Sequence, residues 1–170
     1  METLEAIKTR KSTRVFAKTA IPDEIIETLL KAGMAAPSAV DRRPWKFYVL
    51  KSEESKKKLI AEMRFGKYEC PIIIVPCVDE TKTIPLMHDL AYCDLGAATE
   101  NILLAATDLG LGSVWCAIYP GKAKMKSIRK ALGMPLSITP YSAIYIGYPD
   151  VEKDKGKIKD KFDPKRIEIL

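Results

Sequence analysis

The sequence has little of the material from which most residue-based active sites are built. Its 170 residues include one histidine, His88, and four cysteines, none of which form a CxxC pair. A structural zinc site needs four closely spaced ligands, so we expect none. A Ser-His or Cys-His nucleophilic mechanism is disfavoured as well, because it depends on a positioned histidine. The thiols are expected to be reduced and buried, as is usual in the cytoplasm: Cys70, Cys77, Cys93 and Cys116.

Long apolar runs are also missing. None approaches the roughly 18 residues that span a bilayer, and the N-terminus, METLEAIKTRK, is amphipathic and does not resemble a secretory signal. We therefore expect a cytoplasmic protein without a membrane partner. The composition is globular, with 47% hydrophobic and 29% charged residues. The net charge of +6 permits nucleic-acid binding. Aromatic residues do not interleave with the lysines, however, so we expect no nucleic acid and favour an anionic small molecule.

Periodicity and capping signals outline the secondary structure. They predict helices over 2–9, 22–36, 53–63, 87–109 and 122–132, and strands over 45–50, 71–78, 113–119 and 141–148. Strands and helices do not alternate strictly, which favours an α+β fold over a doubly wound sheet. The strand over 71–78 is nearly all apolar, so we expect helices on both of its faces. The helix over 87–109 is apolar nearly all round, which predicts a central position, with a subunit interface as one option.

The last segment, 151–170, has no apolar periodicity of its own until Ile167–Leu170, which alternates apolar and polar residues. Such a tail is either disordered or wrapped around its own domain or a partner subunit, and the alternation favours wrapping. Its lysines form a solvated face unless the tail returns to the arginines near the N-terminus.

Two segments carry candidate binding chemistry. If residues 10–14 are extended, Arg10, Ser12 and Arg14 point to one side and can bind a phosphate through two guanidinium groups and a hydroxyl; the alternative is a solvated basic turn. The loop over 35–45 is braced by two prolines and can offer backbone groups to a flat heterocycle; the alternative is an ordinary connection.

The glycines at 110 and 112 lie between a helix and a strand. They either form a helix C-cap and a turn, or allow a ligand to approach the backbone closely at Gly112. No strand precedes them and there is no GxGxxG, which excludes a Rossmann fingerprint.

In this order, the segments resemble the nitroreductase family of flavin enzymes. The matching motifs are I-x-x-R-K-S-x-R-x-F (7–16), A-P-S-A-x-D-x-R-P-W (36–45), D-L-G-A-A-x-E-N-I-L-L-A-A (94–106), L-G-L-G-S-x-W (109–115) and K-D-K-F-D-P-K-R-I (159–167). The resemblance implies one α+β domain over 1–170, with a three-layer fold in which helices flank a central, mostly antiparallel sheet. It also implies a homodimer that holds FMN at the subunit interface. The C-terminal strand is expected to be exchanged, so that 151–170 is an arm wrapping the partner.

The resemblance also assigns roles by position. Arg10 and Ser12, with Lys11 beside them, are expected at the FMN phosphate, and Arg14 at the ribityl chain and the O2/N1 edge of the flavin. The remaining expected cofactor contacts are Pro37, Ser38 and Ala39 along the isoalloxazine, Gly112 and Ser113 near N5 and O4, and Lys159 and Lys161 over the phosphate.

The loop departs from the family pattern at Asp41, where the family usually has asparagine. Asp41 can accept the flavin N3–H, but its charge opposes a reduced anionic flavin. Arg14 and Arg43 favour a reduced anionic flavin, so the direction in which these charges shift the redox potential of the flavin is left open. The stretch over 64–87 is short for the family, which leaves the shape of the substrate pocket open too.

The implied function is an FMN-dependent NAD(P)H oxidoreductase. NADH or NADPH reduces the flavin and leaves before a small electron acceptor binds: a nitro compound, a quinone or a flavin. The cofactor supplies the chemistry, so no catalytic side chain is expected. The alternative is a non-catalytic flavin-binding or storage protein.

Overall fold

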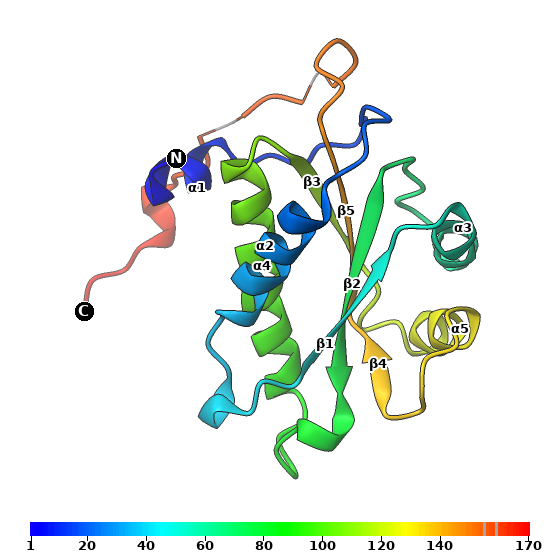
Figure 1. The fold of residues 1–170 in the computed structure, drawn as a ribbon. Coiled ribbons are helices and arrows are strands. Elements are labelled where there is room, and N and C mark those ends of the chain that lie inside the picture. The colour runs from blue at the N-terminus through cyan, green and yellow to red at the C-terminus, as the bar shows by residue number, and fades with distance from the viewer. Residues whose placement is uncertain (155, 159) are drawn as a thin grey trace.

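An antiparallel sheet lies between two layers of helices in the computed structural model, which describes residues 1–154, 156–158 and 160–170 (Figure 1). The strand order is β1-β2-β5-β3, with β4 pairing with β2, and every strand pair is antiparallel. The strands are β1 (Trp45–Leu50), β2 (Ile72–Asp79), β3 (Gly112–Ala117), β4 (Ile138–Pro140) and β5 (Ser142–Gly147). Strands β1 and β3 are therefore edge strands, and β4 also pairs on one side only.

The helices divide between the two faces of the sheet. Helices α2 (Asp23–Met34) and α4 (Leu90–Asp108) cover one face, and α3 (Glu53–Glu62) and α5 (Lys122–Ala131) cover the other (Figure 1). Helix α1 (Thr3–Thr9) packs against α4. Short 3-10 turns are η1 (Ala39–Asp41), η2 (Glu80–Lys82) and η3 (Pro164–Arg166). The predicted α+β class and the antiparallel sheet between helices are confirmed.

Strand β2 shows why the sheet needs two helical layers. Ile73 and Val75 pack into the cluster formed with α3 and α5, while Ile72 and Ile74 pack into the cluster formed with α2 and α4. Side chains alternate across a strand, so a strand that is apolar at every position must be covered twice. The prediction that this strand is covered on both faces is confirmed.

The tail turns back to the N-terminal segment. The Lys11 amino group donates to the carbonyl oxygen of Gly156 (2.8 Å) and forms an ion pair with Asp154 (2.8 Å). The chain then continues past α1, and Ile167–Leu170 is exposed and forms no strand within this chain (Figure 1). Exchange of this segment with a partner stays a prediction. In the described ranges, no helix combines the length and the apolarity required to cross a membrane.

One buried amine links helix α3 to the segment that enters β2. Lys56 is only 7% exposed, and its Nζ donates to the carbonyl oxygens of Cys70 (2.8 Å) and Pro71 (3.3 Å). It also forms an ion pair with Glu53. This ammonium therefore satisfies backbone groups in the segment that enters β2.

Replacing Lys56 with Met should destabilise the fold by about 1–3 kcal/mol, because the two carbonyl oxygens lose their donor while the apolar stem of the side chain remains. Urea unfolding measures this change. The matched control is Lys58→Met on the same helix, where the lysine is exposed and pairs with Glu54; its effect should stay within about 0.5 kcal/mol. Equal effects of the two substitutions would contradict the role given to Lys56.

Candidate functional site

A cavity of about 930 Å³ opens where the N-terminal segment meets the C-terminal tail. Cationic side chains dominate its lining, with two carboxylates among them. The cations are Lys8, Arg10, Lys11, Arg14, Lys157 and Lys161, and the carboxylates are Glu100 and Asp160. Ser12 adds a hydroxyl. This balance of charges suits an anionic ligand.

The segment that carries the two arginines is fixed against edge strand β3. Ser12 and Ser113 form an isolated parallel β-bridge, and the Thr13 amide donates to the Ser113 carbonyl oxygen (2.9 Å). The backbone is extended, so Thr13 is turned inward, with 1% of its surface exposed, while Ser12 and Arg14 line the cavity. Arg10, Ser12 and Arg14 thus lie on one side, as expected of an extended segment, although Lys11 lines the same cavity. The Ser113 carbonyl oxygen therefore already accepts one hydrogen bond within the chain, and its expected contact with the flavin stays a prediction.

Gly112 is required by this packing. A Cβ atom at Gly112 would lie 2.6–2.8 Å from Cγ2, Cβ and Oγ1 of Thr13. The chain's own Thr13 side chain thus makes a close approach at this glycine, and the expected flavin contact at Gly112 stays a prediction.

The two arginines are constrained to different degrees. Arg10 Nε forms an ion pair with Glu100 of α4 (3.2 Å). A guanidinium has five N–H donors, so most of them are left for a ligand. Arg14 donates from Nη1 to the Ser12 carbonyl oxygen (3.3 Å). Burial raises the pKa of the Cys116 thiol, and the positive charges of Arg14 and Lys124 oppose that rise. The positive charge of Arg14 is therefore felt at Cys116 on β3.

Hydrogen bonds to helix α4 and within the loop itself preorganise residues 37–43. The Ala39 amide donates to Asp94 Oδ1 on α4 (3.0 Å), and the Arg43 amide donates to Ser38 Oγ (3.0 Å). Val40, Asp41 and Arg43 have positive φ angles of 45°, 55° and 50°, a conformation that is unfavourable for side chains with a Cβ. Strain of this kind is concentrated at functional sites.

Asp41 and Arg43 neutralise each other. Nε and Nη2 of Arg43 donate to the two carboxylate oxygens of Asp41, both at 2.7 Å. These hydrogen bonds lower the pKa of the Asp41 carboxyl below its ordinary value, so it is ionised at neutral pH. The charge that would oppose a reduced flavin is thus compensated within the loop itself, a balance that the sequence left open.

Within one chain, the residues expected at the cofactor form two groups. Residues 37–43 do not line the cavity; they lie toward the N-terminal end of α4, away from α1 (Figure 1). Their anchor, Asp94, and the Arg10 partner, Glu100, are six residues apart on α4, or roughly 9 Å along the helix axis. Lys161 lines the same cavity as Arg10 and Ser12, and its contact with a phosphate stays a prediction; Lys159 lies outside the described residues.

Sequence reasoning missed the positioning roles of Thr13, Asp94 and Glu100. A signal was present, because Asp94 and Glu100 are carboxylates in a helix that is otherwise nearly apolar. In the part of the chain that the structure describes, no group of three or more His, Cys, Asp and Glu residues is arranged to hold a metal ion.

The chain is thus an α+β protein with a cation-lined cleft at an edge strand, and the comparisons with known proteins agree with this class. It belongs to the nitroreductase family: the model of the Nitroreductase family matches residues 7–64 and 64–148. A protein of Archaeoglobus fulgidus, provisionally named NADH dehydrogenase/NAD(P)H nitroreductase, is 44% identical over 168 residues, which cover 98% of this chain and 96% of that protein.

Solved structures show the same fold. A crystal structure from Parabacteroides distasonis, with the same provisional name, has a TM-score of 0.89 at 36% identity and covers 98% of this chain and 96% of its own. An FMN-dependent nitroreductase from Clostridium difficile has a TM-score of 0.86 at 28% identity, with 98% of both chains covered.

Replacing Gly112 with Ala should destabilise the protein by about 1–3 kcal/mol, because the new methyl group overlaps the Thr13 side chain and pushes residues 10–14 off β3. The control is Gly96→Ala in α4, where the nearest atom to a new Cβ is Tyr141 Oη at 3.4 Å. That change should be neutral or stabilise by up to about 1 kcal/mol. Urea unfolding measures the free energy of unfolding of both variants. A Gly112→Ala protein as stable as the unmodified protein would contradict the packing of Thr13 against Gly112.

Proposed function

We propose that this protein is an FMN-dependent NAD(P)H oxidoreductase that reduces a small, electron-poor acceptor such as a nitro compound, a quinone or a flavin. The observation that carries the proposal is the convergence of Arg10, Ser12 and Arg14 with Lys161 of the tail around one cavity. Guanidinium groups and a hydroxyl match the oxygens of a phosphate dianion. The names of the relatives support an oxidoreductase, and one structural neighbour is FMN-dependent.

The residues present fit FMN. The cavity of about 930 Å³ is within the range of cofactor sites, roughly 300–1,000 Å³, and its cations outnumber its carboxylates. When bound, FMN supplies the redox chemistry, accepting hydride equivalents from the reduced nicotinamide and passing them to the acceptor.

The chain itself supplies binding, orientation and charge. Arg10 and Ser12 hold the phosphate, and the fixed backbone of residues 10–14 keeps them on one side. Arg14 acts along β3 and stabilises negative charge at the flavin edge, which favours the reduced cofactor. The Asp41–Arg43 pair adds no net charge. None of the described residues that line the cavity is a histidine, which suits a reaction in which no side chain acts as acid or base.

A second copy of the chain completes the site in this proposal. The loop over 37–43 lies apart from the cavity of its own chain, so the loop of a partner is free to close it. Exposed apolar side chains include Val40 of this loop, at 80%, and Leu86, at 99%. Strand β1 has an unpaired outer edge of six residues, and Ile167–Leu170 is exposed. If Ile167–Leu170 paired with the partner's β1, both the open edge of that strand and the exposed tail segment would be covered.

The direct test is purification followed by anaerobic titration with NADH and NADPH. The protein should carry flavin absorbance, be bleached by the reductant and regain its colour when the acceptor is added. A protein that binds FMN but shows no turnover supports the storage alternative. A colourless protein that cannot be reconstituted with FMN rules out both.

Replacing Arg10 with Ala should weaken FMN binding by about 1.5–3 kcal/mol, the contribution of a charge-assisted hydrogen bond. Titration of the apoprotein with FMN measures it. Arg129→Ala, on α5 across the sheet, is the matched control and should bind FMN normally. Equal affinities of the three proteins would rule out the phosphate assignment.

Ending the chain at Arg166 should convert the dimer into a monomer, because the exchanged strand is lost. Sedimentation of the FMN-loaded full-length and shortened proteins measures the change. A full-length protein that sediments as a monomer with FMN bound would contradict the shared site, and a shortened protein that remains dimeric would contradict strand exchange.

A further inference from the structure

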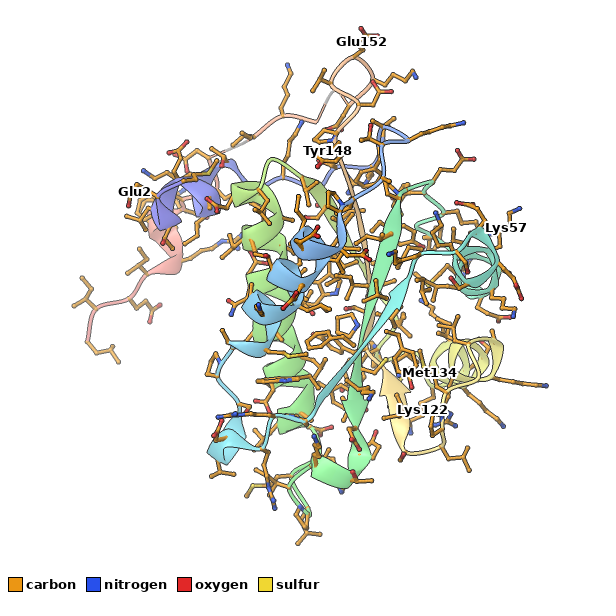
Figure 2. All side chains as sticks on the ribbon, viewed as in Figure 1. Glu2, Lys57, Lys122, Met134, Tyr148 and Glu152 are labelled. Carbon is orange, nitrogen blue, oxygen red and sulfur yellow. The ribbon has the colours of Figure 1, made fainter. Side chains whose placement is uncertain are left out.

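A second cavity, of about 640 Å³, lies on the other side of the molecule. Its walls are the segment that follows the arginines (16–18), helix α3, and residues 67–71 before β2. It shares no lining residue with the first cavity. Phe16 packs into the cluster of the α3 and α5 face, whereas Glu100 of the first cavity belongs to α4 on the opposite face. Lys57 lies on α3, on the side of the sheet away from α1 and α4 (Figure 2).

Four lysines from three segments of the chain line this second cavity: Lys18, Lys56, Lys57 and Lys67. Lys18, Lys57 and Lys67 make no hydrogen bond or ion pair to the residues that the structure describes. Lys56 is occupied, because its amine binds two carbonyl oxygens and Glu53. Glu69 is the remaining carboxylate of the lining. The lining therefore carries four ammonium groups against the two carboxylates of Glu53 and Glu69, and this excess of positive charge favours an anion.

The remaining lining is mostly apolar and packs against the core. Phe16, Ile60, Tyr68 and Pro71 contribute to it. The Tyr68 ring contacts buried Tyr145 edge-on, with centroids 5.5 Å apart and an angle of 82°. Behind the wall, a Cβ added at Gly147 would lie 2.6 Å from Pro71 and 3.1 Å from Phe16. Tight packing of this kind keeps the cavity from collapsing.

We propose that this second cavity binds a small organic anion with a phosphate or carboxylate head and a flat apolar body. The head lies among Lys18, Lys57 and Lys67, and the body lies against Tyr68 and Phe16. Lysine ammonium groups bind such heads as mobile point charges, and aromatic faces bind flat apolar groups. The site is separate from the flavin cavity and does not depend on the proposed oxidoreductase activity.

The test is calorimetric titration of the full-length protein, saturated with FMN, with 2-naphthyl phosphate as the probe. We expect saturable binding, with inorganic phosphate competing only at higher concentration. Lys57→Gln and Lys67→Gln should each weaken binding roughly tenfold, the scale of one charge-assisted contact. The matched control is Lys58→Gln, the neighbouring α3 lysine that does not line the cavity and pairs with Glu54; it should bind like the unmodified protein.

Three outcomes would overturn the proposal. One is the absence of saturable binding. Another is an equal loss of affinity in Lys57→Gln and Lys58→Gln, which would indicate general attraction to a basic surface. The third is probe binding that perturbs the visible absorbance of the flavin and is unchanged in Lys57→Gln and Lys67→Gln, which would place the probe in the flavin site. Thermal unfolding of each variant, expected to match that of the unmodified protein, checks that the fold is retained.

Discussion

The candidate site depends on one constraint, the attachment of residues 10–14 to edge strand β3. A backbone hydrogen bond from Thr13 to Ser113 and the contact of the Thr13 side chain with Gly112 fix this attachment. Because Thr13 must point inward, extended geometry makes Ser12 and Arg14 point outward. A short basic sequence that would otherwise be a solvated turn thus becomes one wall of a cavity.

Helix α4 positions two further parts of the candidate site, the loop over 37–43 and the Arg10 side chain. It spans the layer beside the sheet, and its acidic side chains contact segments distant in sequence, Asp94 the loop at Ala39 and Glu100 the guanidinium of Arg10. Asp94 is only 8% exposed, so its carboxylate would be costly without a partner. The Glu100 side chain is 45% exposed, so its ion pair with Arg10 is a surface contact. The separation of Asp94 and Glu100 along the helix keeps the strained loop away from the cavity of its own chain. This separation is the reason for proposing that two copies of the chain share one cofactor site.

Sequence patterns predicted the fold well where burial is periodic. Strands β1, β2, β3 and β5 and all five helices lie within three residues of the predicted bounds. Strand β4 was missed because it has three residues and ends in Pro140, which donates no hydrogen bond to a sheet. The site was predictable in composition but not in arrangement. Nothing local shows that Thr13 contacts Gly112, that Asp94 binds the Ala39 amide, or that Val40 adopts a left-handed conformation, because these features depend on tertiary contacts.

The most direct measurement of the central claim compares the affinities of the apoprotein for FMN and for riboflavin, which differ only in the phosphate. If the cavity between the N-terminal segment and the tail holds the phosphate, FMN should bind at least roughly tenfold more tightly, the scale of one charge-assisted hydrogen bond. The advantage should fall as salt concentration rises, since exposed charges are screened. Equal affinity for the two flavins would contradict the account, because the cations around Ser12 would then have no part in binding the cofactor.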